Sequence, residues 1–251
     1  MTPVDDQSHK LRFFITSPHS CNYLEDREAT SVFADPYFPK DKALYSRLVT
    51  NGFRRSGEHL YKPHCATCSE CVPVRVPVNE FKMRRNQKRT WKLNQDLSIE
   101  KSKATFKEEH FLLYQKYQSA RHPNGGMDNS SKDDYIEFLL ASWSDSYLYE
   151  FRLEGELVAV SVVDELEDAY SAIYTFFDTD LQQRSLGKFA ILALIEQSKR
   201  DGFSSLYLGY WISSCDKMKY KVDYQPIECL IDEEWKKFNS LTFNDFAVAK
   251  N

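Results

Sequence analysis

Three residues in the second half of the chain, Asp178, Ser185 and Gly187, have the types and spacing that suit acyl transfer. Asp178 closes an aromatic run, and its carboxylate suits either the deprotonation of an amine or the capping of the following segment. Ser185 and Gly187 open an apolar helix, whose free backbone N–H groups can hold a phosphate or a developing oxyanion. An ordinary helix start is the alternative. We therefore take all three as candidate catalytic residues.

A cysteine cluster has the spacing of metal ligands, with Cys65, Cys68 and Cys71 each separated by two residues. A structural zinc site needs four ligands, so His64, Cys21 or Cys215 would have to complete the set. Clustered thiols in a tight loop are the alternative, because no second cysteine pair follows at zinc-ribbon distance. We predict no resident metal or other cofactor. If a metal were bound, Cys65, Cys68 and Cys71 would be its ligands.

Positive charge is segregated although the net charge of the chain is −4. Residues 81–92 contain no acid, and their basic side chains are Lys82, Arg84, Arg85, Lys88, Arg89 and Lys92. A second group, Lys217, Lys219 and Lys221, is spaced at every second residue beside Tyr220. Both groups are suited to contact phosphates. The alternative is that they are the solvated faces of the elements that carry them.

The length of 251 residues allows one large domain or two small ones. The first ten residues have no apolar stretch typical of a signal sequence, and nowhere do about 18 apolar residues run together to span a membrane. Six cysteines in a chain of this length do not require disulfides. We therefore expect a cytoplasmic protein.

The apolar pattern of the second half predicts the elements that position the candidates. Two helices come first, over 106–119 and 132–142. Three strands, one helix and one strand follow, over 146–153, 156–165, 170–177, 185–200 and 205–211.

The first half is predicted to contain two short strands within 11–34 and a helix over 42–50 that Asp41 caps. Residues 72–78 alternate, and their two prolines favour an edge or irregular strand. A strand near 97–101 follows. We divide the chain into an amino-terminal α/β domain, 1–100, with the cysteine loop and the basic segment, a carboxy-terminal transferase domain, 101–240, and a tail, 241–251.

The β-β-β-α-β order predicts an α+β fold like that of the GCN5-related N-acetyltransferases. In that fold a glycine turn at the helix start receives the pyrophosphate of acyl-coenzyme A. Here Gly187 is present, but Phe189 stands where a second small residue is expected. This difference favours an acyl donor other than coenzyme A.

Several motifs together resemble the bacterial aminoacyl-tRNA–protein transferases, in particular the Asp/Glu leucyltransferase branch. They are CNYL (21–24), NGFRRSG (51–57), YKPHCATCSECVPVRVPV (61–78), FKMRRNQKR (81–89), FFDTDLQQRSLGKFAIL (176–192), LYLGYWI (206–212) and CDKMKYKVDYQPIE (215–228). Eukaryotic relatives carry Cys-x-x-Cys near the N-terminus and some bind a metal or iron–sulfur group there. This chain has Cys21 but Leu24, which favours the leucyl branch.

The resemblance implies transfer of leucine, or alternatively arginine, from aminoacyl-tRNA to proteins that begin with Asp or Glu, marking them for N-end rule degradation. Leucyl-tRNA and such proteins are then the partners. A fixed guanidinium suits the acidic side chain, so we assign substrate binding to Arg54, Arg55, Arg75 and Tyr210. We assign tRNA binding to Arg84, Arg85, Lys88, Arg89, Lys217, Lys219, Tyr220 and Lys221. A coenzyme A-dependent N-acetyltransferase and a non-catalytic RNA-binding module are the alternatives.

Overall fold

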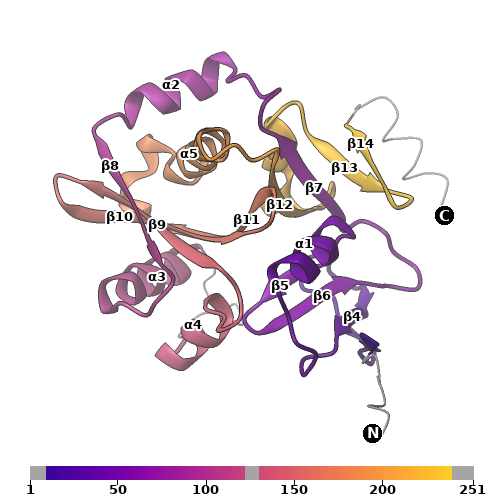
Figure 1. Ribbon diagram of the computed structural model, residues 1–251. Helices are drawn as coiled ribbons and strands as arrows, with labels where there is room; N and C mark the ends of the chain where they lie inside the picture. The colour runs from indigo at the N-terminus through magenta and orange to yellow at the C-terminus, as the bar shows by residue number, and fades with distance from the viewer. Residues whose placement is uncertain (1–9, 122–129, 239–251) are drawn as a thin grey trace, which may run out of the picture.

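One large mixed sheet organises the chain (Figure 1). The computed structural model describes residues 10–121 and 130–238. Eight strands lie in the order β14-β13-β7-β12-β11-β10-β9-β8, and β11 and β12 are the parallel neighbours. The strands are β7 (Val72–Pro77), β8 (Leu97–Lys103), β9 (Ser146–Leu153), β10 (Glu156–Glu165), β11 (Ala169–Phe177), β12 (Ser205–Trp211), β13 (Glu228–Ile231) and β14 (Glu234–Lys237).

Helices cover both faces of this sheet, as their apolar residues require. On one face α5 (Leu186–Arg200) packs on the central strands, and α2 (Arg85–Leu93) lies over α5 (Figure 1). The Trp91 and Phe189 rings, 5.4 Å apart, join the two helices. On the other face α3 (Glu108–Arg121) and α4 (Lys132–Leu139) bury an aromatic cluster that includes Tyr114, Tyr135 and Phe176. The sheet is therefore buried on both sides.

A second sheet forms the amino-terminal part, with strand order β1-β4-β6-β5. Its members are β1 (Phe13–Ile15), β4 (Ser31–Ala34), β5 (Arg54–Ser56) and β6 (His59–Pro63), and a small pair, β2 (His19–Ser20) and β3 (Glu28–Ala29), lies beside it. The helix α1 (Lys42–Thr50) is capped by Asp41, which accepts a hydrogen bond from the Leu44 N–H at 2.7 Å, as predicted. Tyr45 and Phe53 share a buried cluster with Tyr207 of β12. This cluster fastens the second sheet to the first.

The predicted β-β-β-α-β order is confirmed by β9, β10, β11, α5 and β12, and the two helices that precede it by α3 and α4. Between β11 and α5 lies the 3₁₀ turn η1 (Thr179–Arg184), and after β12 come α6 (Asp216–Lys219) and η2 (Tyr220–Asp223). Among the described residues, none of the helices is both long and apolar enough to cross a bilayer.

One alternative given for residues 72–78, an edge strand, was wrong. The run 72–78 is an interior strand, because β7 pairs with β12 along its length and with β13 at Val74 and Arg75, neither of which is a proline. The last described strand, β14, continues past Trp235 to Lys237. The proposed boundary at residue 100 falls within β8, and the tail 241–251 lies outside the described residues.

Candidate active site

A wedge opens between β11 and β12, the two parallel strands. They pair only through Ala169–Ser171 and Ser205–Tyr207, although both strands continue beyond these residues. At Gly209 the chain adopts the left-handed φ of +76°, and the register of β12 against β7 shifts between Tyr207 and Gly209. Such a kink turns the end of β12 away from β11, so side chains from elsewhere can enter between the strands.

Arg54 of β5 fills the near end of this wedge. Its Nη2 donates to the Ala172 carbonyl of β11 at 2.8 Å. On the β12 side it lies so close to Gly209 that a Cβ there would be 2.6 Å from the Arg54 Cζ. The Nη1 of Arg54 is buried without a hydrogen-bond partner, and no acid among the described residues forms an ion pair with this guanidinium. The wedge thus holds a cation with an unused donor, which suits a carboxylate.

Tyrosines surround Arg54. Burial is the main cause that raises the pKa values of Tyr23, Tyr61 and Tyr210, and the nearby charge of Arg54 only partly opposes it. These hydroxyls therefore stay protonated at neutral pH. The predicted substrate residue Tyr210 is 4% exposed and donates to the Gly52 carbonyl at 2.9 Å. Its hydroxyl is committed to the fold, so we withdraw it as a direct substrate contact.

Lys221 is the second cation of the wedge. It is only 7% exposed, and its Nζ donates to the Tyr210 carbonyl at 2.5 Å. Burial first, and the charge of Arg54 second, lower the pKa of Lys221 to about 7. The prediction that Lys221 contacts tRNA phosphates on an exposed row was wrong, because the side chain points inward.

The other residues of that predicted row do lie at the surface, but on a short helix. Lys217 and Lys219 are exposed on α6, and Lys219 pairs with Asp216 at 2.6 Å. Tyr220, 44% exposed, begins η2, which contacts β12, and lies near enough to Arg54 for the charge of that guanidinium to act on it. Since helical residues two apart do not share a face, the spacing did not produce a continuous basic row.

The candidate catalytic aspartate serves as a cap. Asp178 accepts a hydrogen bond from the Asp180 N–H at 2.9 Å and pairs with Lys116 at 2.6 Å. Burial, the largest contribution, would raise the pKa of Asp178, but these two hydrogen bonds and the Lys116 charge together lower it. A carboxylate with a lowered pKa is a poor base near neutral pH. Its position supports the capping alternative.

The helix start after Asp178 is open to solvent. Ser185 is exposed, has a left-handed φ of +51° and makes no side-chain capping bond. Gly187 packs closely on the end of β11, because a Cβ would lie 2.9 Å from Cε1 of Phe177. Tyr117 contacts two rings of the same strand edge-on, Phe177 at 4.9 Å and Tyr174 at 6.3 Å. An oxyanion role for Ser185 and Gly187 stays a prediction.

Arg55 is not free to bind substrate, contrary to the prediction. Its side chain and that of Asp164 are both fully buried, and they form a bidentate pair at 2.6 and 2.9 Å. Although burial alone would lower the pKa of Arg55, Asp164 raises it. Tyr45 and Ser146 each donate to the same carboxylate at 2.6 Å. Arg55 therefore joins the small sheet to β10 of the large one.

Arg75 is also engaged within the protein. Its Nε lies 2.7 Å from a carboxylate oxygen of Glu228 and its Nη1 donates to the Tyr207 hydroxyl at 3.2 Å. The guanidinium lies over the Trp235 ring at 4.4 Å. Of the three predicted arginines, Arg54 alone has a buried donor without a hydrogen-bond partner, whereas Arg75 is engaged with Glu228 and Tyr207.

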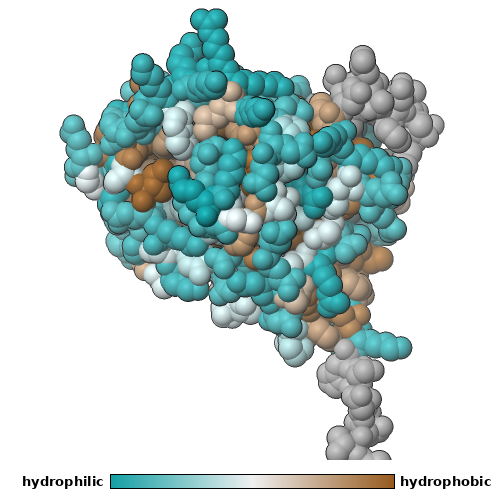
Figure 2. Space-filling model, turned by 45° about the horizontal axis from the view of Figure 1, so that its top comes forward, coloured by the Kyte–Doolittle hydropathy of each residue, from teal (hydrophilic) through white to brown (hydrophobic). Residues whose placement is uncertain are grey.

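The basic segment forms the outer face of α2. The exposed side chains are Lys82, Arg84, Arg85, Lys88, Arg89 and Lys92. Gln87 and Thr90 point inward, so the basic residues cover the solvent side of the helix. Figure 2, with this side turned forward, shows mostly hydrophilic side chains. No ion pair to an acid is found for these six within the described parts of the chain. The face is suited to phosphates.

The cysteines do not form a closed metal site. Cys21, Cys65, Cys68, Cys71 and Cys215 are all free thiols. Burial, and then the neighbouring Cys68, raise the pKa of Cys71 to about 12. No three of the described cysteines have their sulfurs within 4.8 Å of one another. Since no three of these sulfurs come together, the arrangement supports the clustered-thiol alternative.

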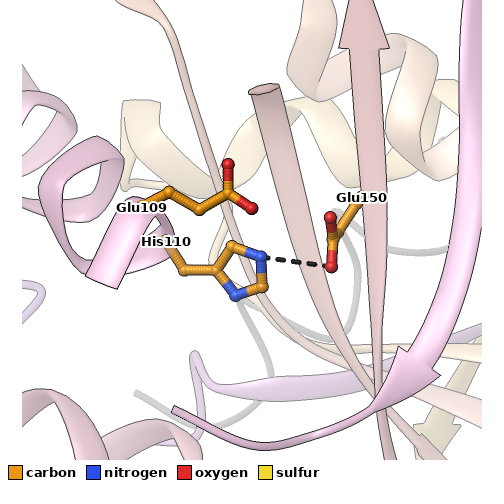
Figure 3. Close-up of side chains that lie close together, drawn as sticks. All are labelled: Glu109, His110 and Glu150. Atoms are coloured by element: carbon orange, nitrogen blue, oxygen red, sulfur yellow. Dashed lines mark ion pairs between the residues drawn. The ribbon is translucent and has the colours of Figure 1, made fainter. Parts of the chain in front are cut away.

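Glu109, His110 and Glu150 do lie close together, where α3 packs on β9 (Figure 3). Lys107 and Arg152 each lie 2.5 Å from Glu150, and Arg152 also reaches Glu109 at 2.5 Å. These oxygens are already neutralised by cations, whose charge opposes a metal ion. Burial lowers the pKa of His110. The trio is an ion-pair network of the core.

Sequence reasoning missed Lys221 as an interior residue, and it missed Tyr23, Tyr61 and Gly209. The signal for Gly209 was present, since a glycine in an aromatic strand indicates a kink or the close approach of another group. Nothing in the sequence places the Arg54 guanidinium against that glycine, because β5 and β12 are about 150 residues apart.

The two diverging parallel strands and the helix α5 that connects them give the α+β arrangement that the β-β-β-α-β order predicted. Two family descriptions match, "Arginine-tRNA-protein transferase, N terminus" over residues 19–89 and "Arginine-tRNA-protein transferase, C terminus" over 109–231. The chain is 48% identical over 230 residues to the aspartate/glutamate leucyltransferase of Pseudomonas fluorescens Pf-5 and 47% identical to that of Pseudomonas putida KT2440. In both cases 92% of this chain and 98% of the relative are covered. The chain therefore belongs to the aspartate/glutamate leucyltransferase family.

Solved structures are more distantly similar. FemX shares 7% identity at a TM-score of 0.45, covering 83% of this chain and 81% of FemX. L-PGS from Bacillus licheniformis shares 12% identity at a TM-score of 0.47, covering 72% of this chain and 64% of L-PGS. Values this low say nothing about substrates.

Proposed function

We propose that the protein transfers leucine from leucyl-tRNA to the α-amino group of proteins that begin with Asp or Glu. The observation that carries the proposal is the unpaired guanidinium of Arg54 in the wedge of an acyltransferase sheet. Family membership supports the donor and the acceptor, because the relatives are named for leucyl transfer and for aspartate and glutamate. The modification would mark the acceptor protein for N-end rule degradation in the cytoplasm.

Arg54 selects the acceptor in this proposal. The Nη1 donates to the acidic side chain of the incoming N-terminus, while the Nη2 bond to the Ala172 carbonyl fixes the orientation of the guanidinium. An acceptor without the acid would leave the buried Arg54 cation unpaired. Such an acceptor would bind more weakly by several kcal/mol, because the charge-assisted pair is missing. The site would thus discriminate Asp from Asn.

The donor tRNA contacts α2 in the proposal. Arg84, Arg85, Lys88 and Arg89 supply phosphate contacts on the exposed face of this helix, and Lys217 and Lys219 lie exposed on α6. The exposed ring of Tyr220 beside the wedge suits stacking of a base from the single-stranded acceptor end.

The reaction itself requires no cofactor, because aminolysis of an aminoacyl ester proceeds downhill without further activation. Positioning of the two reactants supplies most of the acceleration, and donors at the start of α5 near Gly187 would stabilise the oxyanion. The buried Phe189 one turn into α5 supports an aminoacyl-tRNA donor over coenzyme A. Arginyl-tRNA is the alternative donor.

The test measures leucine transfer from leucyl-tRNA to peptides that differ only in the first residue, Asp, Glu, Asn or Ala. We expect transfer to Asp and Glu peptides, and a loss of about 100-fold in kcat/KM for Asp in Arg54→Gln, since a hydrogen bond to a charged group contributes about 1.5–3 kcal/mol. The preference for Asp over Asn should disappear in this variant.

Arg47→Gln, on the exposed face of α1, is the matched control and should behave as the wild type. Competition with arginyl-tRNA and with acetyl-coenzyme A identifies the donor. If Arg54→Gln kept the preference for Asp over Asn, Arg54 would not be the selector. Acetyl transfer without leucyl transfer would instead support the N-acetyltransferase.

A further inference from the structure

The turn that precedes α5 is not held by its own residues. Ser185 has a left-handed φ of +51°, which is uncommon and costly for a residue with a side chain. Its side chain makes no capping bond, and η1, which comes directly before it, buries none of its residues. Because such a conformation persists only where the surroundings determine it, the support for this turn comes from other elements.

One support is the side chain of Asn94, the C-cap residue of α2. Its Nδ2 donates to the Arg184 carbonyl at 2.8 Å and to the Thr90 carbonyl, one turn back in α2, at 2.9 Å. Asn94 is 0% exposed, so water does not compete for these hydrogen bonds. A single amide thus ties the last turn of α2 to the residue directly before Ser185.

The second support is an ion pair of Arg184. Its Nη1 and Nη2 each lie 2.8 Å from a carboxylate oxygen of Asp96, and Nη1 also donates to the Leu93 carbonyl at 3.3 Å. A bidentate pair fixes the orientation of the guanidinium as well as its position. We call Asn94, Asp96 and Arg184 the α2–α5 clip.

The clip connects η1 to a different element than the other anchor of this turn does. At the opposite end of η1, Lys116 of α3 lies 2.6 Å from Asp178 and 2.6 Å from Asp180. That anchor leads to the face of the sheet that α3 covers. The clip leads instead to α2, whose outer face carries the basic side chains from Arg84 to Lys92.

Two parts of the donor site therefore belong to elements that the clip joins. In the proposed function α2 contacts the phosphates of leucyl-tRNA, and backbone N–H groups at the start of α5 stabilise the oxyanion of its ester. The Trp91 and Phe189 rings, 5.4 Å apart, join the bodies of these two helices, whereas the clip fixes the turn itself. A displacement of about 1 Å at a reacting site can reduce the rate by about 100-fold, so this spacing matters for transfer.

We propose that Asn94 and Asp96 are positioning residues, which act through Arg184 to hold the start of α5 at a fixed place relative to the tRNA-binding face of α2. The inference rests on the proposed leucyl transfer and adds the part of the protein that aligns the donor ester. Loss of the clip should leave tRNA bound on α2 and misplace its ester. The defect then falls on the transfer rate and not on the affinity for tRNA.

The test replaces Asp96, whose side chain is half exposed, so its loss opens no cavity in the core. Asp96→Ala removes the ion pair, and Asp96→Glu keeps a carboxylate that can reach Arg184. The matched control is Glu108→Ala, which removes a similarly exposed carboxylate from a 2.7 Å pair with Lys132 on the opposite face of the sheet. Glu108 has no place in the proposed site.

Two quantities are measured for each variant, the single-turnover rate of transfer to an Asp peptide at saturating leucyl-tRNA and the Kd for leucyl-tRNA. We expect the rate of Asp96→Ala to fall by about 10- to 100-fold, and its Kd to stay within about threefold of the wild type. Asp96→Glu should recover most of the rate, because the carboxylate–guanidinium pair forms again. Glu108→Ala should match the wild type in both quantities.

Hydrogen–deuterium exchange of the full chain gives a readout that is independent of transfer. In Asp96→Ala the segment 181–190 should exchange several-fold faster than in the wild type, because its turn has lost one anchor. The segment 108–121 should exchange as before. In Glu108→Ala the segment 181–190 should match the wild type.

The outcomes separate the two proposals. A wild type that transfers no leucine would overturn the proposed function and the clip with it. A wild type that transfers, combined with a rate of Asp96→Ala within about threefold of Glu108→Ala, would overturn the clip alone. A Kd defect of Asp96→Ala as large as its rate defect would show that Asp96 only supports the fold of α2, and this result or an unchanged exchange of residues 181–190 would overturn the clip as well.

Discussion

Replacement of Gly209 by Ala tests whether the placement of Arg54 governs activity. The new Cβ would lie 2.6 Å from Cζ and 2.8 Å from Nη1 of Arg54. Carbon atoms in contact need about 3.5–4.0 Å, so the guanidinium must move by roughly 1 Å. A displacement of that size at a reacting site can reduce the rate by about 100-fold. We expect this loss in kcat/KM for Asp peptides.

The chain offers a matched control for the backbone strain. Gly202, at the end of α5, has a φ of +78°, close to the +76° of Gly209, and a Cβ there meets nothing within 4 Å. Alanine at either position costs about 1–2 kcal/mol of stability, because a side chain disfavours left-handed φ. Gly202→Ala should therefore lose stability but not activity.

The assay is transfer to Asp and Asn peptides at 20 °C, with thermal unfolding measured in parallel. Gly209→Ala should lose activity on Asp peptides far more than on Asn peptides, because only the former need Arg54. If Gly209→Ala kept its activity on Asp peptides within about threefold of Gly202→Ala, the wedge would not be the acceptor site.

Three further outcomes are expected. Asp164→Asn should destabilise the protein by about 3–5 kcal/mol in urea unfolding, because it leaves the buried Arg55 charge uncompensated; a loss below 1 kcal/mol would contradict the buried pair. The double variant Arg85→Gln/Arg89→Gln should lower the slope of log affinity for tRNA against log salt by roughly 1.5, and an unchanged slope would remove α2 from the tRNA surface. For Glu150, burial is the largest effect on the pKa and would raise it, but hydrogen bonds from Lys107 and Arg152 lower it to about 2. Its contribution to stability is therefore complete above about pH 4.5 and lost as the pH falls toward 2, so Glu150→Gln should flatten acid unfolding in that window.

The elements of the second half were predictable because each carries its own signal. The strand 205–211 and the helix that ends at Arg200, shortly before Gly202, are bounded by local residues, and the structure places them as predicted. The helix over residues 85–93 was not predicted, because Trp91 and Leu93 are its only apolar residues. Its buried side is made by the polar residues Gln87 and Thr90, so the segment has no apolar helical pattern.

The site was predictable only in part. Arg54 and Arg55 are adjacent and identical in type, yet in β5 they point to opposite sides, one into the wedge and one toward Asp164. The sequence does not say which of the two meets an acid, because Asp164 is contributed by a distant strand. For the same reason Lys221 was indistinguishable from its exposed neighbours until Tyr210 and Arg54 were placed around it.

The location of β7 has a consequence for how the polypeptide can be made and cut. This strand is flanked by β12 and β13, which the ribosome delivers more than 120 residues later. A fragment ending near residue 100 would present both of its hydrogen-bonding edges to other molecules, and unprotected edges promote aggregation. The amino-terminal part should thus become soluble only when co-expressed with the remainder, and split versions of the enzyme should be joined by complementation rather than purified as separate pieces.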